Sequence, residues 1–134
     1  MTVGYNLGAI ALDDLSVIKH LSALASAGNY STLEIPVDTE YQVPAGNKFV
    51  VGKIQAKSLV ADVSFRIGYG DTIVNDSGTP PTNFIELTQP YPIVLVNGIE
   101  EINLIIEIPV GKYPCIRAVG GTALLEVEGY EQQL

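Results

Sequence analysis

The stretch 58–69 reads SLVADVSFRIGY and places an apolar side chain at every second position. The apolar set is Leu59, Ala61, Val63, Phe65, Ile67 and Tyr69, and the opposite set includes Ser58, Asp62, Ser64 and Arg66. Successive side chains of a β-strand point to opposite faces, so this alternation predicts a strand with one face in a core and the other in water. It sets the fold class as β.

Strand-like runs continue on both sides of this stretch. They cover 32–37, 48–57, 84–88, 92–97, 101–108, 113–119 and 122–130, and the run 48–57 is expected to pair with 58–69 as its neighbour. Asn97-Gly98 predicts a hairpin, because this pair readily adopts the positive φ angles of a type I′ turn. Residues 70–83, GDTIVNDSGTPPTN, form the one loop long enough to project and carry a role of its own.

Short strands separated by regular turn signals predict a sandwich or barrel, and no helices lie between them to support a parallel α/β fold. We therefore expect an all-β protein: a single jelly-roll-like antiparallel β-sandwich of about eight strands over residues 32–134. An immunoglobulin-like sandwich is the alternative, because the pattern does not fix the connectivity.

The amino-terminal residues 1–31 follow a different pattern and predict an arm with a short helix at about 13–26. The apolar residues Leu12, Leu15, Ile18, Leu21 and Leu24 or Ala25 recur at spacings of three and four positions and would form one helical stripe. Asp13 and Asp14 suit the start of a helix, and Gly28-Asn29 suits its end. An arm without regular structure is the other interpretation, since the serines and Val17 are mediocre helix formers.

Two similar stretches, Val43-Pro-Ala-Gly-Asn-Lys and Ile108-Pro-Val-Gly-Lys-Tyr, precede strand-like runs. Proline fixes its own φ and lacks an amide hydrogen, and glycine adopts a positive φ at little cost. Both stretches therefore predict corners, with Pro44 and Gly46 in the first and Pro109 and Gly111 in the second. They are either equivalent positions in two halves of a Greek-key sandwich or a coincidence of six residues.

Composition excludes some functions. With 15 acidic and 7 basic residues the net charge is −8, which argues against binding to nucleic acid. No run approaches the roughly 20 uninterrupted apolar residues of a spanning helix, so no membrane is expected. Yet 47% of the residues are hydrophobic and only 16% are charged. This apolar surplus predicts a protein–protein interface, and therefore a homo-oligomer.

Catalytic, cofactor and metal sites are not expected. His20 is the only histidine and Cys115 the only cysteine, so neither a catalytic triad nor a structural zinc site can be assembled from the usual residues. We expect His20 on the surface of the amino-terminal helix or in an interface, and Cys115 as a buried, inert thiol. Asp71, Asn75 and Asp76 form either a solvated loop tip, which we favour, or a calcium site. Glu86, Glu100, Glu101 and Glu107 could supply a carboxylate pair of the glycosidase type. Any acidic β protein offers such pairs, so these residues alone do not indicate a glycosidase site.

Carbohydrate binding is the main rival to a purely structural role. Sugar sites on β-sandwiches use exposed aromatic rings, and this chain offers seven tyrosines and no tryptophan. Tyr91, between Pro90 and Pro92, is the best candidate for an exposed ring. The alternative is that the tyrosines pack inward with their hydroxyls at the rim.

The phrase YQVPAGNKFVV, residues 41–51, resembles the openings of small β-sandwich virion proteins of tailed bacteriophages. These include capsid decoration (cement) proteins and the head domains of tail fibres. The resemblance implies a structural, non-enzymatic virion protein on the capsid surface, a homotrimer that binds the major capsid protein and stabilises the head. A receptor- or glycan-binding fibre tip is the alternative that it implies.

Overall fold

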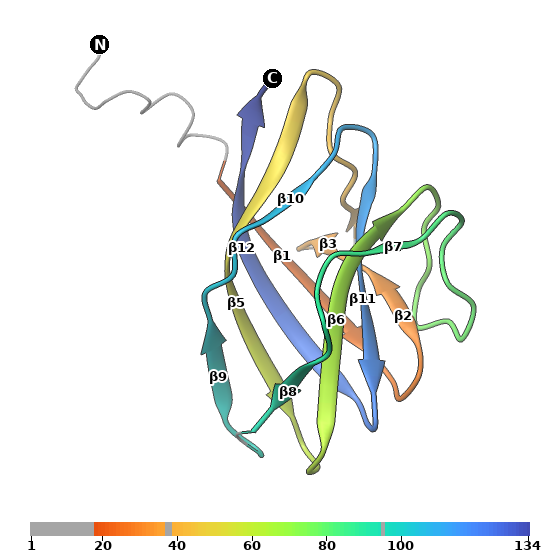
Figure 1. The fold of residues 1–134 in the computed structure, drawn as a ribbon, viewed down its shortest axis with the longest axis vertical. Coiled ribbons are helices and arrows are strands. Elements are labelled where there is room, and N and C mark those ends of the chain that lie inside the picture. Colours follow the sequence, from red (N-terminus) through yellow and green to blue (C-terminus); the bar gives the residue numbers. More distant parts are fainter. Residues whose placement is uncertain (1–17, 37–38, 95) are drawn as a thin grey trace, which may run out of the picture.

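The computed structural model describes residues 18–36, 39–94 and 96–134, and these form two antiparallel β-sheets packed face to face (Figure 1). The described residues contain no helix. The strands are β1 (Ile18–Ala25), β2 (Tyr30–Thr32), β3 (Glu34–Ile35), β4 (Thr39–Glu40), β5 (Asn47–Ser58), β6 (Val63–Gly70), β7 (Ile85–Glu86), β8 (Tyr91–Ile93), β9 (Ile99–Ile102), β10 (Ile106–Ile108), β11 (Tyr113–Val119) and β12 (Ala123–Gln133). The expected all-β sandwich is confirmed, with more and shorter strands than the eight predicted.

The strands pair in a nested order. The first sheet runs β10-β5-β12-β1-β3-β4, with β9 also on β5, and the second runs β2-β11-β6-β7, with β8 also on β6. Thus β1 pairs with β12, β2 with β11, β5 with β9 and β10, and β6 with β7 and β8. In addition, β12 pairs with β5, and β11 pairs with β6. The first long strand therefore pairs with the last, and the early strands β2, β5 and β6 pair with strands from the second half of the chain, while β3 and β4 extend the first sheet beyond β1.

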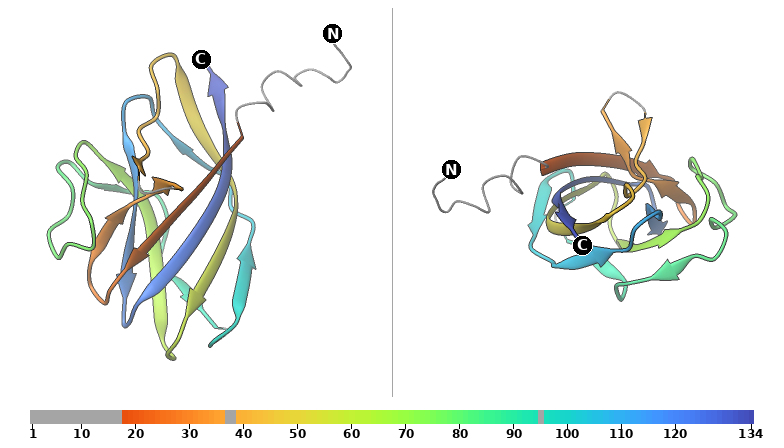
Figure 2. Two further views of the ribbon diagram at one scale, coloured as in Figure 1. Left: turned by 180° about the vertical axis from the view of Figure 1, so that it is seen from behind. Right: turned by 90° about the horizontal axis from the view of Figure 1, so that it is seen from above.

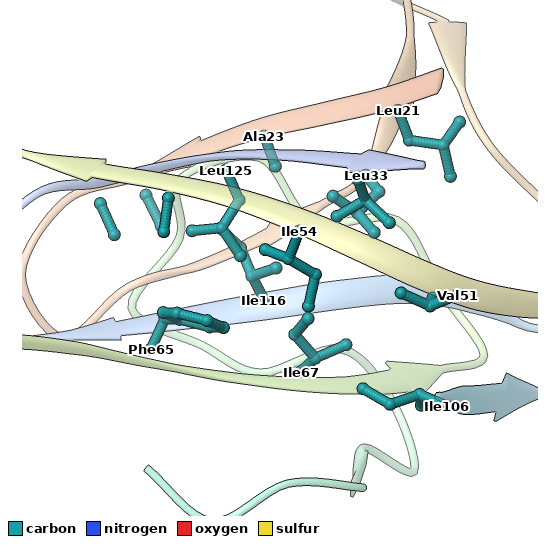
Figure 3. Close-up of a cluster of buried hydrophobic side chains, with 14 of the residues drawn as sticks. Leu21, Ala23, Leu33, Val51, Ile54, Phe65, Ile67, Ile106, Ile116 and Leu125 are labelled. Atoms are coloured by element: carbon teal, nitrogen blue, oxygen red, sulfur yellow. The ribbon is translucent and has the colours of Figure 1, made fainter. Parts of the chain in front are cut away.

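The core lies between the two sheets (Figures 2 and 3). Phe65 and Ile67 of β6 and Ile116 of β11 face Ile54 of β5 and Leu125 of β12, and all five side chains are fully buried. Full burial of each such side chain stabilises the fold by about 1.5–3 kcal/mol. The alternation predicted for 58–69 is confirmed from Val63 onward, where β6 begins.

The start of that stretch is not a strand. Residues 59–62 form the turn between β5 and β6, and Asp62 takes a positive φ of 63°. The predicted pairing of 48–57 with 58–69 is also wrong, because β5 and β6 belong to opposite sheets. Leu59 and Ala61, predicted to face the core, belong to the exposed turn.

The helix predicted at 13–26 is wrong over its described part, because Ile18–Ala25 is strand β1. β1 pairs with β12 over its whole length, from Ile18 opposite Tyr130 to Ala25 opposite Ala123. The apolar residues that suggested a helical stripe lie on opposite faces of the strand: Leu21 is buried and Leu24 is exposed. A long partner strand outweighs the weak helical preference of the segment. Residues 13–17 lie outside the described residues.

Consequently, residues 18–31, which the sequence assigns to an arm, are part of the sandwich. β1 lies inside the first sheet and β2 begins the second. The rest of the predicted arm, residues 1–17, lies outside the described residues.

Both Pro-Gly stretches are corners, as predicted. Gly46 and Gly111 have φ angles of 81° and 79°, and the corners lie side by side. The Gly111 amide donates to the Val43 carbonyl at 2.8 Å, and the Val43 amide donates to the Lys112 carbonyl at 3.0 Å. The two corners are therefore adjacent parts of one end of the sandwich.

Asn97-Gly98 does not close a hairpin. Asn97 has the predicted positive φ, 61°, but the strands on either side join different sheets: β8 pairs with β6 and β9 pairs with β5. The turn carries the chain from one sheet to the other, which a local turn signal cannot distinguish from a hairpin.

Candidate interaction surface

At one end of the sandwich, β5 and β1 end and β6, β9 and β12 begin (Figure 1). Exposed apolar side chains gather at this end. The described ranges contain fourteen exposed large hydrophobic residues, and seven of them lie at this end. We call this group the apolar end patch; its residues are Leu24, Leu59, Val60, Val94, Val96, Ile99 and Leu124.

Strand register places three of these residues in one row across the first sheet. Leu24 of β1 is opposite Leu124 of β12, Leu124 is opposite Lys57 of β5, and Lys57 is opposite Ile99 of β9. A shallow hollow of about 180 Å³ lies between Leu124 and Ile99. The row therefore forms a continuous strip whose only charged member is Lys57.

Two turns complete the patch beside this row. The β5–β6 turn carries Leu59 and Val60, which are 65% and 51% exposed. The chain between β8 and β9 lies against the end of β5. Val96 forms an isolated β-bridge with Ser58, and the amide of Asn97 donates a hydrogen bond to the carbonyl of Ser58 at 2.9 Å. Turns of soluble proteins are usually polar, so apolar residues at two adjoining turns make this end a candidate interaction surface.

Polar and charged groups occupy the outer face of the same sheet beside the patch. His20, Glu128 and Lys53 follow one another across β1, β12 and β5, and they line a groove of about 350 Å³. Lys53 also pairs with Glu101 at 3.3 Å. His20 is exposed, as predicted, but it projects from a strand and not from a helix. The apolar end patch is thus bordered by a polar sheet face.

The glutamates considered as carboxylate pairs each have a different partner. Glu86 pairs with Arg66 at 2.8 Å and Glu107 with Lys48 at 3.1 Å, and Glu100 accepts the Val94 amide at 2.8 Å. Glu86 also belongs to the second sheet, whereas the others belong to the first. The structure therefore assigns these carboxylates to separate ion pairs and a loop contact.

The long loop 70–83 does not project freely, because it is bonded along the edge of β2. Tyr30 and Ser77 exchange two backbone hydrogen bonds, at 2.7 and 2.9 Å. Asp76 accepts bonds from the amide and hydroxyl of Ser26 and from the Asn29 side chain, at 2.7–3.0 Å. These bonds hold the pKa of Asp76 below its ordinary value.

The three residues of the suggested calcium site are not brought together by shared contacts. Asp71 accepts hydrogen bonds from Lys112 and Asn83, which lower its pKa, whereas Asp76 is bonded to the turn between β1 and β2. Asn75 between them is exposed. Among the residues that the structure describes, no three His, Cys, Asp or Glu side chains are grouped as metal ligands would be.

Cys115 is fully buried on β11, as predicted. Burial raises the pKa of its thiol from 9.0 to about 12, so the reactive thiolate is suppressed at neutral pH.

Tyr91 is not the exposed ring that the sequence predicted. Its ring stacks on core residue Phe65, with the centroids 5.7 Å apart and the planes 28° apart. Tyr30 and Tyr41 are buried, and the other described tyrosines are at least half covered. The interpretation in which tyrosines pack inward is the one that the structure supports.

The sequence alone does not reveal a pair of arginines on the second sheet. Arg66 of β6 and Arg117 of β11 are the only arginines, and they lie directly opposite each other. They are 51 positions apart in the chain, and only the register of β6 with β11 brings them together.

No family model matches the chain, and neither the curated proteins nor the solved structures gave a match. Among the described residues, no helix has the length and apolar character needed to span a membrane.

Proposed function

We propose that the protein is a structural, non-enzymatic component that assembles with copies of itself, as a homotrimer. We further propose the virion of a tailed bacteriophage as its setting, where it is a capsid decoration protein that binds the major capsid protein. The apolar end patch is the observation that carries the self-assembly.

Energetics support a contact through this patch. Burying a large aliphatic side chain contributes about 1.5–3 kcal/mol, whereas association costs about 4–15 kcal/mol in lost freedom of motion. The seven patch side chains are 36–70% exposed, so each can gain about half of that amount, and seven from each partner together exceed the lower part of the range for the cost of association. The net charge of −8 makes separate copies repel each other, so the apolar contact must overcome this repulsion.

The nested strand pairing supports the jelly-roll class within the β-sandwiches. In a jelly roll, a long antiparallel hairpin is rolled up so that the first strand pairs with the last, the second with the one before it, and so on. The pairings of β1 with β12, β2 with β11, β5 with β9 and β10, and β6 with β7 and β8 follow that order. The resemblance of residues 41–51 to phage virion sandwiches supplies the biological setting.

A glycan-binding fibre tip receives less support. An exposed Tyr91 ring would favour sugar binding, and this ring instead stacks on Phe65. The neighbouring genes distinguish the two settings: a capsid, portal or terminase gene supports the decoration protein, and tail genes support the fibre.

Matched serine variants test the role of the patch. Leu59→Ser and Ile99→Ser each remove a side chain that is more than 60% exposed within it. Ile105→Ser is the control, because Ile105 is 84% exposed but lies outside the patch, between β9 and β10. We expect light scattering after gel filtration to show a smaller assembly for the patch variants alone. Equal masses for all three variants and the original chain would contradict an interface at this end.

A further inference from the structure

Arg66 and Arg117 point away from the core on the outer face of the second sheet. Their neighbours in sequence, Phe65, Ile67 and Ile116, are fully buried on the inner face, so the alternation of the strands sends both arginines outward. Like charges directly opposite each other across two strands are destabilising. The two positive charges therefore repel each other, and neighbouring groups are expected to offset this repulsion.

Neighbouring strands compensate this pair only in part. Arg66 donates to Glu86 at 2.8 Å, while the Arg117 guanidinium lies over the Tyr30 ring, 5.2 Å from its centroid. Arg117 forms no ion pair with any residue in the described ranges. The cluster of two arginines and one glutamate therefore keeps a local charge of +1 on a chain whose net charge is −8.

Both guanidinium groups lie with their Nε atoms covered. The two Nε atoms are buried and have no hydrogen-bond partner among the described residues. Unpaired buried donors are unfavourable, and in native structures they usually have a specific explanation. Burial of Nε leaves the outer nitrogens as the part of each guanidinium that a ligand can reach, and the Arg66 side chain is 29% exposed.

We propose that Arg66 and Arg117 together bind a carboxylate, held between their outer guanidinium nitrogens. A planar guanidinium matches the geometry of a carboxylate and forms strong charge-assisted hydrogen bonds with it. A monoanion neutralises the local charge of +1, whereas a dianion such as sulfate would leave the cluster negative. A groove of about 260 Å³ beside Arg66 provides room for the body of a small acid; it is lined by Glu86, Leu87, Thr88, Gln89 and Pro90.

The arginine Nε–Hε NMR signals report on this site directly, because the chain contains two arginines and therefore gives two such signals. Because both Nε atoms are buried, we expect their hydrogens to exchange slowly with water and both signals to be observable near neutral pH. We expect acetate and glucuronate to shift both signals with saturation, while sodium chloride at the same ionic strength does not. Tighter binding of glucuronate than of acetate identifies a sugar acid as the source, and equal binding identifies a simple carboxylate such as an acidic side chain.

Two variants of equal charge complete the test. Arg117→Gln should weaken carboxylate binding about tenfold or more, because it removes a charge-assisted contact. Lys48→Gln changes the net charge equally but lies on the other sheet and outside the apolar end patch, and it should leave binding unchanged. The proposal is overturned if the signals of the original chain respond no more to carboxylate than to chloride, if sulfate binds more tightly than acetate, or if Lys48→Gln weakens binding as much as Arg117→Gln.

Discussion

The amide of Gly111 donates a hydrogen bond to the carbonyl of Val43 at 2.8 Å, and this bond joins the two Pro-Gly corners. The corners are 65 residues apart in the sequence, from Pro44 to Pro109, yet they close the same end of the sandwich. Their conformations and their contact can be tested separately.

Gly46→Ala and Gly111→Ala should each lower the free energy of unfolding by about 1–2 kcal/mol, since an alanine at positive φ is strained. An added Cβ meets no atom within 4 Å at either position, so strain is the only expected effect. Gly129→Ala should lower it further, because its Cβ would lie 2.6 Å from the Phe49 ring. Urea unfolding measures all three; a Gly111 variant as stable as the original chain would contradict the corner conformation.

Tyr41→Phe should destabilise the fold by about 1–3 kcal/mol. The Tyr41 hydroxyl donates to Glu131 at 2.6 Å, and both residues are buried, so its removal leaves the carboxylate with only a 3.5 Å contact from Asn47. Burial and the Glu131 contact raise the Tyr41 pKa above its ordinary value. The contribution of the Tyr41 hydroxyl to the free energy of unfolding is therefore present below about pH 10 and is lost at higher pH. Urea unfolding at pH 7 and above pH 10 should show this extra alkaline loss in the original chain and not in Tyr41→Phe; equal losses would exclude the assigned role.

Cys115 should resist thiol reagents in the folded protein and react fully after unfolding. Because the folded pKa is raised from 9.0 to about 12, the folded state keeps a proton that the unfolded state releases. The thiol's contribution to stability is therefore constant below about pH 9 and falls by up to about 1.4 kcal/mol per pH unit between pH 9 and 12. Urea unfolding across this range should show a shallower pH dependence for Cys115→Ala. Rapid labelling of the folded chain at neutral pH would disprove burial of the thiol.

Asp76→Ala should release the long loop from the edge of β2. The change removes the hydrogen bonds to Ser26 and Asn29, and hydrogen exchange at the amides of Tyr30 and Ser77 should accelerate. Asn75→Ala is the control, because this neighbouring residue is exposed. The Asp76 pKa is lowered, so the contact is complete above pH 3.8 and is lost as the pH falls. Equal exchange in both variants would show that Asp76 does not hold the loop.

Local patterns in the sequence predicted local features well. The alternation of Val63, Phe65 and Ile67 identified the inner face of β6, and the glycines of both corners have the predicted positive φ. The features that depend on a partner strand were not predictable in this way. Residues 18–25 form a strand because β12 lies beside them, and Asn97 lies between two sheets because β8 and β9 pair with different strands.

The same distinction applies to the candidate site. The apolar surplus predicted an interaction surface without saying where it lies, and the position of the candidate surface depends on two turns, at Leu59 and at Val96, that meet only in the folded chain. The arginine pair likewise depends on the register of β6 and β11, which no short motif encodes.

The mass of the purified chain in solution, measured by multi-angle light scattering at micromolar concentration, tests the proposed self-assembly most directly. We predict a mass three times that of one chain, maintained or strengthened when added salt screens the net charge of −8. A monomer across the micromolar range, at low and at high salt, would contradict the proposal that the apolar end patch is a contact between copies of this protein.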